Sequence, residues 1–280
     1  MLQIEYQNEW GSLSLHRKPC RVLSVTGLGL PEREFETVRY ADSHGQQTMS
    51  VTDCPRVITM SVDLLMNCGL GRELARMARI LYRPGRLLIR SAGKTRVIPC
   101  RCTAWEEDGR TPILAKLILQ FTCDDPAFLE EKERSEGVYQ RTNLIYGSFT
   151  LPTVFSSKIT EKDVINTGDL PVQPILILRN TGEDTASAGV TIVNTPPSGV
   201  NQTFQLTRPL LAGEQVRVDF PGRRVDSDQR GSLLHSISDD TYLNAFTLEQ
   251  GKNHIEVTAG IGDKMAVSCI FIPKYLEGMY

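Results

Sequence analysis

The chain has 280 residues, 40% hydrophobic and 23% charged, enough for a sizeable core in two domains or one large one. Its 31 basic and 33 acidic residues exclude a general polyanion binder, because such proteins need a basic excess. No run approaches the roughly 18 apolar residues of a membrane-spanning helix. The first ten residues also lack the basic start and apolar stretch of a signal peptide, so we expect folding in a cytoplasm.

Alternation of apolar and polar residues predicts strands in the first half of the chain. These strands are expected at residues 58–64, 86–90, 95–105 and 115–123. A helix is expected at 69–82, because four apolar residues there recur at steps of four, three and four and form one stripe. The helix should end at Arg83-Pro84-Gly85, since proline cannot continue the hydrogen-bond ladder.

The second half of the chain predicts an antiparallel β-sandwich. From about Gly147 onward, short strands alternate with turns at roughly eight to twelve residues, with no helix between them. They are expected at 175–178, 190–192, 216–220, 255–257 and 265–271. Charged residues without an apolar face dominate 130–141, which we interpret as a linker. We expect limited proteolysis to cut first between Glu130 and Asn143. The predicted fold is mainly β with one helix, with domains at 1–132 and 146–280 and a linker at 133–145.

The cysteines are odd in number and scattered: Cys20, Cys54, Cys68, Cys100, Cys102, Cys123 and Cys269. Cys100 and Cys102 are separated by one residue, which is closer than the spacing of a zinc-binding pair. We expect seven free thiols, most of them buried as small apolar groups. Cytoplasmic assembly predicts the same outcome.

Catalytic motifs are absent from the sequence: it has no nucleophile elbow, phosphate-binding glycine loop or zinc-protease helix. Its histidines, His16, His44, His235 and His254, are far apart. Asp226-Ser227-Asp228 with Gly231 starts like a calcium loop, but Ile237 stands at the twelfth position, where a bidentate Glu is required. A hairpin turn explains that segment better. We therefore expect no catalytic residue, no cofactor and no metal ion.

Arginines form a second stripe on the predicted helix, opposite the apolar one: Arg72, Arg76, Arg79 and Arg83. Two interpretations stay open. One is a solvated helix face, and the other is a subunit interface in which guanidinium groups pair with carboxylates of a neighbour. Nucleic-acid binding is a weaker third interpretation, because no aromatic residues interleave with the stripe.

Several short motifs follow one another along the chain. The first half has a glycine-bearing opening, a Gly-x-Gly-x-Pro step, an Asp-x-x-Gly turn and an Arg-led strand, at 10–13, 27–31, 42–45 and 56–64. The second half has Gly168-Asp169 before a proline-flanked strand, then 211–214, 248–253 and Tyr275. In this order and spacing, over essentially the whole chain, they resemble the siphophage distal tail protein (Dit) family.

The resemblance implies an N-terminal β-rich belt domain, similar to tail-tube proteins, that closes into a hexameric ring. It implies a galectin-like β-sandwich as the C-terminal domain. Such a protein is a structural component of the tail tip of a phage or tail-like particle, not an enzyme. Its implied partners are its own copies, the tail tube protein and the tail-tip hub or tail fibre protein of the baseplate. DNA passes through the ring, and no specific nucleic-acid binding and no membrane are implied. It is placed in the virion tail tip after assembly in the host bacterial cytoplasm.

The alternative is a carbohydrate- or receptor-binding β-sandwich adhesion protein of the tail tip. Such a protein needs exposed aromatic side chains that stack on sugar rings. Both tryptophans, Trp10 and Trp105, lie in the first half of the chain. We therefore expect sugar binding by the second half to be absent or weak.

Overall fold

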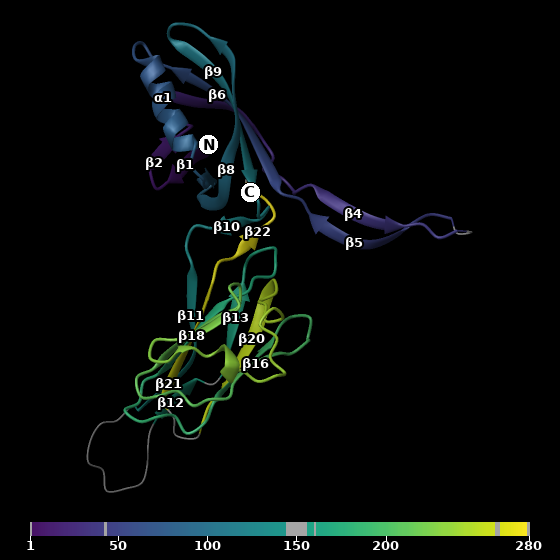
Figure 1. Cartoon of the computed structure of the whole chain (residues 1–280), viewed down its shortest axis with the longest axis vertical. Coiled ribbons are helices and arrows are strands. Elements are labelled where there is room, and N and C mark those ends of the chain that lie inside the picture. The colour runs from purple at the N-terminus through teal and green to yellow at the C-terminus, as the bar shows by residue number, and fades with distance from the viewer. Residues whose placement is uncertain (1, 42–43, 144–155, 160, 261–263, 279–280) are drawn as a thin grey trace. The chain divides into compact units, whose positions relative to one another are not determined.

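The computed structural model describes residues 2–41, 44–143, 156–159, 161–260 and 264–278 (Figure 1). The chain divides into two compact units. Unit 1 comprises Met1–Glu131 and Tyr275–Tyr280, and unit 2 comprises Lys132–Lys274. The described residues are mainly in strands, with one α-helix. The fold class predicted from the sequence is thereby confirmed.

Unit 1 is built around an antiparallel sheet that folds over on itself. Its main strands lie in the order β2 (Gly11–Ser14), β1 (Gln3–Asn8), β7 (Gly85–Ser91), β8 (Lys94–Arg110), β9 (Leu114–Cys123), β6 (Arg56–Leu65) and β3 (Cys20–Thr26). Strand β8 pairs with β7 through its first half and with β9 through its second half. The two halves of the sheet share one core, in which the rings of Tyr6 and Phe121 lie 5.5 Å apart.

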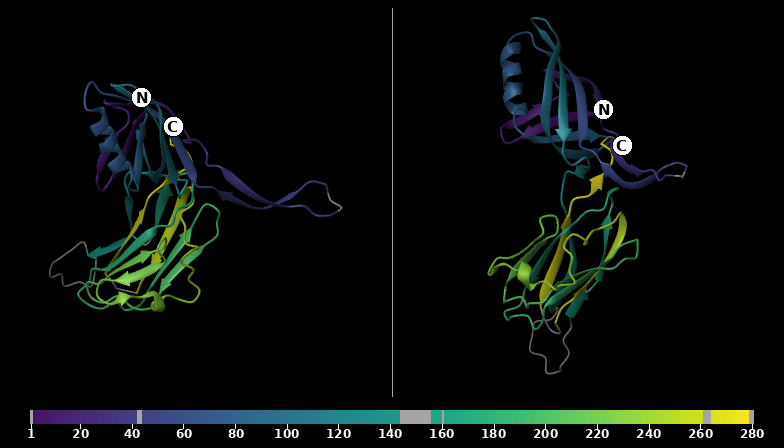
Figure 2. Two further views of the ribbon diagram at one scale, coloured as in Figure 1. Left: turned by 45° about the horizontal axis from the view of Figure 1, so that its top comes forward. Right: turned by 45° about the vertical axis from the view of Figure 1, so that its right-hand side comes forward.

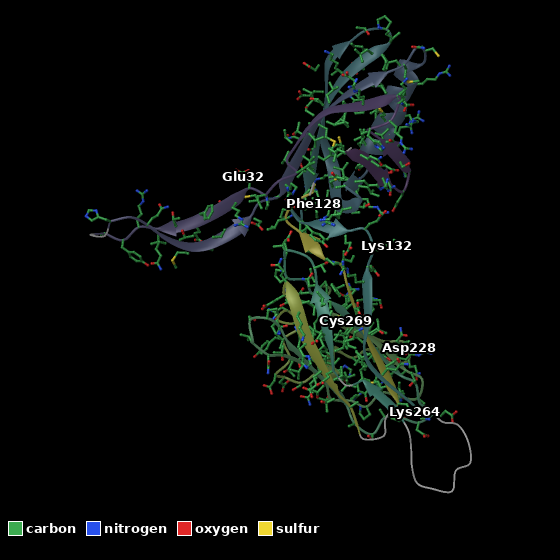
Figure 3. All side chains as sticks on the ribbon, turned by 180° about the vertical axis from the view of Figure 1, so that it is seen from behind. Glu32, Phe128, Lys132, Asp228, Lys264 and Cys269 are labelled. Atoms are coloured by element: carbon green, nitrogen blue, oxygen red, sulfur yellow. The ribbon has the colours of Figure 1, made fainter. Side chains whose placement is uncertain are left out.

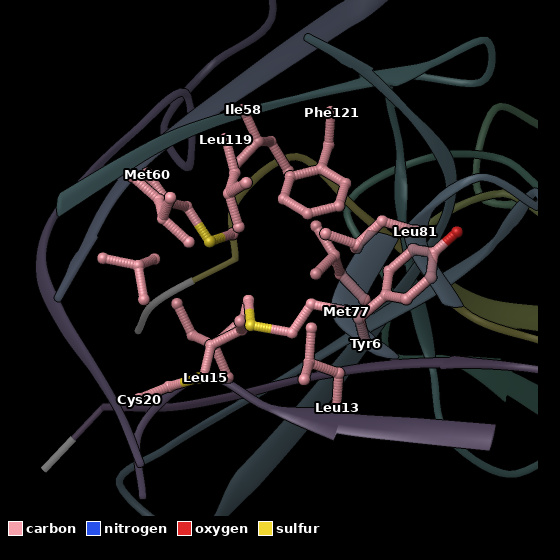
Figure 4. Close-up of a cluster of buried hydrophobic side chains, with 14 of the residues drawn as sticks. Tyr6, Leu13, Leu15, Cys20, Ile58, Met60, Met77, Leu81, Leu119 and Phe121 are labelled. Atoms are coloured by element: carbon pink, nitrogen blue, oxygen red, sulfur yellow. The ribbon is translucent and has the colours of Figure 1, made fainter. Parts of the chain in front are cut away.

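The helix α1 (Leu70–Leu81) closes this core, as its apolar stripe predicted. Five of its side chains are buried: Leu70, Leu74, Met77, Ile80 and Leu81. Figure 4 shows Met77 and Leu81 between Leu13 of β2 and Phe121 of β9. Apolar burial of this kind supplies most of the stability of a short helix.

A two-stranded hairpin, β4 (Arg33–Val38) and β5 (Gln47–Asp53), leaves the sheet and extends away from it (Figures 1 and 2). Within the described part of the chain its strands pair only with each other. The sequence analysis predicted only a turn here, at 42–45, of which residues 42–43 lie outside the described residues. The hairpin strands themselves were not predicted.

Two short strands complete unit 1. Strand β10 (Phe128–Glu130) pairs with β8. Strand β22 (Lys274–Tyr275), where the chain re-enters unit 1, pairs with β10. The predicted second domain included residues 275–280, but the structure places the described residues 275–278 in unit 1. The amide of Gly278 donates a hydrogen bond of 2.9 Å to the Leu28 carbonyl, which holds this segment there.

Unit 2 is a β-sandwich of two antiparallel sheets. In one, the strands lie in the order β12 (Ser156–Ile159), β11 (Arg134–Asn143), β21 (Met265–Phe271), β14 (Ile175–Asn180), β17 (Gln215–Asp219), β18 (Arg224–Ser227) and β19 (Gly231–Ser232). In the other, they lie in the order β13 (Glu161–Asn166), β20 (Gly251–Thr258), β15 (Val190–Thr195) and β16 (Gln202–Leu206). A 3₁₀ turn, η1 (Leu234–Ser236), follows β19. The ring of Phe220 stacks on that of Phe246 at 4.5 Å in the core.

The structure places a strand where the sequence analysis predicted a linker. Strand β11 covers most of 133–145 and pairs with β21 on one side and with β12 on the other. Its register shifts between Gly137 and Tyr139, and the neighbours Val138 and Tyr139 are both buried. This bulge breaks the two-residue alternation by which a strand is recognised in a sequence.

Candidate functional site

The described residues contain no group of three or more His, Cys, Asp or Glu side chains arranged to hold a metal ion. His16 contacts the Ile4 carbonyl and His254 contacts Asp163, whereas His44 and His235 are exposed. The structure brings no two of these histidines together into a site.

The segment that starts like a calcium loop is a hairpin turn between β18 and β19, as the sequence analysis favoured. Asp226 is exposed on β18, and the Asp228 carboxylate accepts a hydrogen bond of 3.0 Å from the Gln215 amide. The Ser227 hydroxyl donates instead to buried Glu214. The three side chains therefore do not converge on one point.

The predicted arginine stripe lies on the exposed side of α1. Arg72, Arg76, Arg79 and Arg83 are all exposed, and the buried residues of the helix lie on its other side. Residues of an α-helix rotate by about 100° each, so Arg72, Arg76 and Arg79 fall within an arc of about 60°. Arg83 follows the helix, two residues after its last residue, Leu81. The stripe is therefore narrow and continuous.

Two of the four arginines already have partners within the subunit. Arg76 makes a two-pronged contact with Glu73, at 2.6 and 3.0 Å. The Arg83 guanidinium lies over the Trp10 ring, 4.8 Å from its centroid. Arg72 and Arg79 have no hydrogen bond or ion pair to any residue that the structure describes. They are the two that remain available to another molecule.

The β4–β5 hairpin presents apolar side chains to solvent. Phe35 and Val51 face each other across the two strands and are 57% and 51% exposed. Large apolar side chains cost free energy in water, and an isolated two-stranded hairpin is at best marginally stable. The sequence analysis overlooked this element because a strand with no buried face lacks the apolar alternation that identifies strands.

Arg56 fixes the base of the hairpin and was also overlooked. It is 3% exposed and donates hydrogen bonds to the carbonyls of Pro126 (2.7 Å), Gly27 (2.8 Å), Gly29 and Leu276 (2.8 Å). Burial lowers the pKa of its guanidinium, and the Phe128 ring lies 4.5 Å away.

The predicted Gly-x-Gly-x-Pro step supplies two of the carbonyls that Arg56 binds. Gly27 has a φ of +86°, and a Cβ there would lie 2.1 Å from the Val57 carbonyl oxygen. Only glycine fits that approach. Figure 3 shows Glu32, just after this step, where the hairpin leaves the body of unit 1.

Two further observations concern membranes and sugars. The α-helix has 12 residues, and no helix in the described segments is long and apolar enough to cross a membrane. In the described part of unit 2, Tyr242 is the exposed large aromatic residue, at 69%.

Comparison with known proteins extends these observations to the whole chain. No protein-family model and no curated protein matches the sequence. The structure is similar to the crystal structure of the Dit protein of phage SPP1, described as a paradigm of the hub adsorption apparatus in phages that infect Gram-positive hosts. The TM-score is 0.72 at 13% identity, and the match covers 98% of this chain and 99% of that one.

A second similar structure is a chain of the phage P2 baseplate in its activated conformation with calcium. Its TM-score is 0.51 at 8% identity, covering 96% of this chain and 98% of that one. At such identities the likeness shows the fold. The resemblance to distal tail proteins that the sequence motifs indicated is thereby confirmed at the level of the fold.

Proposed function

We propose that this chain is a structural ring subunit of the tail tip of a phage or a phage-tail-like particle, assembled in the host bacterial cytoplasm. The ring, with six subunits, joins the tail tube protein to the tail-tip hub or tail fibre protein and gives passage to DNA. The likeness to the SPP1 Dit structure over the full length of both chains supports this function. The chain acts by assembly and performs no catalysis.

The exposed hairpin carries the proposal. It holds Phe35 and Val51 in solvent, and nothing in the described subunit covers them. A second copy that covers the hairpin removes this apolar surface from water and stabilises the two-stranded element. A hairpin that docks on a different surface of the next copy makes a head-to-tail contact, and such contacts form a ring when the rotation between successive copies closes.

Removal of the hairpin tests this function. The Cys54 amide donates a hydrogen bond of 2.8 Å to the Glu32 carbonyl, so a two-glycine turn can replace residues 33–53. We expect the wild-type chain to form closed oligomers at high concentration, or with the hub protein, in native mass spectrometry. The deletion variant should remain monomeric while its tryptophan fluorescence shows a folded unit 1.

Matched point variants separate the hairpin from general surface effects. Phe35→Ser with Val51→Ser should weaken assembly, whereas Ile113→Ser, at another exposed apolar residue of unit 1, should leave assembly unchanged. A wild-type chain that stays monomeric at high concentration and beside its hub partner contradicts the ring function. So does a deletion variant that assembles normally.

A further inference from the structure

The β4–β5 hairpin has an acidic face as well as an apolar one. Glu34 and Glu36 are two residues apart on β4, so their side chains point to the same face. Glu32 extends this row by one step, because its carbonyl continues the ladder by accepting the Cys54 amide. All three carboxylates are exposed. At the strand rise of about 3.4 Å per residue, they extend over about 14 Å.

Among the described residues of the hairpin, no basic side chain forms an ion pair with a carboxylate of this face. The residues opposite the three glutamates are Cys54, Thr52 and Ser50. Glu36 accepts a hydrogen bond of 2.9 Å from the Ser50 hydroxyl. Arg33 points to the other face, where it pairs with Asp53 at 3.0 Å. Three neighbouring carboxylates without a cation favour a basic partner.

The arginine stripe on α1 has a comparable length. Within the helix, from Arg72 to Arg79, it extends over about 10 Å at the helical rise of about 1.5 Å per residue, and Arg83 lies two residues beyond the end of the helix. Successive arginines of the helix are four and three residues apart, hence about 6 and 4.5 Å along the axis. Successive glutamates of the hairpin are about 7 Å apart. Long, flexible arginine side chains can bridge that difference.

The two surfaces lie on opposite sides of unit 1. Figures 1 and 2 show α1 on one side of the sheet and the hairpin extending from the other. One subunit therefore cannot bring its own glutamates to its own arginines. A second copy can, and the resulting contact joins different surfaces of the two subunits, as a ring requires.

We propose that the acidic face of the hairpin, Glu32, Glu34 and Glu36, docks on the arginine stripe of α1 in the next copy of the chain. This inference rests on the ring function proposed above and names the partner of each surface. Arg72 and Arg79, which have no partner among the described residues, receive the carboxylates first. Exposed ion pairs are individually weak and are screened by salt, so the pairing sets direction and register while the apolar face contributes affinity.

Charge reversal on each surface tests the pairing. The hairpin variant carries Glu34→Arg and Glu36→Arg, and the helix variant carries Arg72→Glu and Arg79→Glu. Each variant alone opposes like charges at every contact, so its half-assembly concentration should rise about tenfold or more. Circular dichroism should show that both fold as the wild type does, because all four positions are exposed.

A mixture of the two variants gives the sharper result. The hairpin variant has arginines on both surfaces, and the helix variant has glutamates on both. When the two variants alternate, every hairpin therefore meets a helix of opposite charge. The 1:1 mixture should therefore assemble again, and native mass spectrometry should find rings in which the two variants are equal in number. A single chain with all four substitutions should also assemble alone.

The control variant carries Glu106→Arg and Asp108→Arg, another exposed acidic pair two residues apart on a strand of unit 1. It should assemble as the wild type does. If the wild type forms rings and the two reversal variants form them equally well, the pairing is wrong and the ring function stands. The pairing is also wrong if each variant assembles weakly alone and the 1:1 mixture does not restore assembly. A wild type that forms no oligomer overturns the ring, and the pairing with it.

Discussion

Arg56 donates a hydrogen bond of 2.8 Å from Nη2 to the carbonyl oxygen of Leu276, 220 residues further along the chain. The same guanidinium binds the Gly27 and Gly29 carbonyls at the start of the hairpin segment. One side chain thus connects the base of the hairpin to the C-terminal segment of unit 1. This connection explains how unit 1 is assembled from two distant parts of the chain.

Arg56→Lys should destabilise unit 1 although it retains the charge. A lysine ammonium has one nitrogen and cannot reach the four carbonyls that the planar guanidinium joins, so buried acceptors lose their partners. We expect the free energy of unfolding to fall by more than about 2 kcal/mol. Both tryptophans lie in unit 1, so tryptophan fluorescence during urea unfolding measures this unit. Arg101→Lys, at an exposed arginine paired with Asp124, is the control; equal stabilities would contradict the role of Arg56.

Strands and the helix were predictable where one face is buried. In β6 the alternate residues Ile58, Met60, Val62 and Leu64 are all buried, and burial is what imposes the alternation on the sequence. The β4–β5 hairpin was not predictable in this way, because neither of its faces is buried in the subunit. Strand β11 was concealed by its bulge, which puts Val138 beside Tyr139 in the core.

Arg72, Arg76 and Arg79 were predictable as a stripe, because helical periodicity alone places them together, and Arg83 follows just beyond the end of the helix. The partner proposed for them was not predictable without the hairpin, whose acidic face becomes apparent only once β4 and β5 are paired in register. The Arg56 contact to Leu276 depends on the return of the chain to unit 1. No local pattern indicates such a long-range contact.

Substitution of Arg230 should destabilise unit 2 more than substitution of its partner Glu214. The Glu214 carboxylate is fully buried and accepts hydrogen bonds of 2.7 and 2.6 Å from Arg230, whose own side chain is 22% exposed. Arg230→Ala strands a buried carboxylate, which costs about 3 kcal/mol or more. Glu214→Gln leaves Arg230 able to reach water, so its cost should be smaller. Urea unfolding followed by circular dichroism measures both; the reverse order would contradict this asymmetry.

The same pair gives unit 2 a pH dependence. Burial raises the pKa of Glu214, but hydrogen bonds from Arg230, Ser227 and the Leu211 amide outweigh burial and hold it below its ordinary value. Because folding lowers this pKa, the ionised carboxylate stabilises unit 2 in full at pH values above the ordinary Glu pKa. This stabilisation is lost as the pH falls through the pKa of the folded state. Glu214→Gln should flatten that part of the stability profile. Hydrogen exchange of peptides across 211–230 at decreasing pH checks the result.

One thiol should react quickly in the native chain. All seven cysteines are free, and Cys68 is exposed, whereas Cys20, Cys100, Cys123 and Cys269 are buried. Burial raises the pKa of Cys20 to about 11 and that of Cys269 to about 12, which leaves little reactive thiolate. Titration with a thiol reagent at pH 8 should give one fast phase that Cys68→Ser removes. Denaturation without reductant should reveal all seven thiols; fewer would indicate a disulfide.

The boundary of unit 2 can be tested with fragments. The structure includes β11 in this unit, whereas the domain predicted from the sequence begins after it. Residues 130–143 were expected to be the first site of proteolysis, but β11 pairs with β21 from Arg134 to Gln140 and with β12 from Gln140 to Asn143. It also contributes Val138 and Tyr139 to the core. Limited proteolysis should therefore spare residues 134–143. A fragment Lys132–Lys274 should fold cooperatively and remain monomeric, since it holds the complete sandwich.

A fragment that starts at Asn143 should not fold in the same way. It lacks two buried core side chains, each worth about 1.5 to 3 kcal/mol, and it exposes the edge of β21. We expect it to aggregate, or to unfold at a much lower urea concentration than Lys132–Lys274, as measured by circular dichroism. Lys132–Lys274 with Val138→Ala should fall between the two fragments, because it keeps the strand and loses part of one core side chain. If the fragment from Asn143 proves as stable as Lys132–Lys274, β11 is dispensable. The unit would then begin after it, as the sequence analysis had placed it.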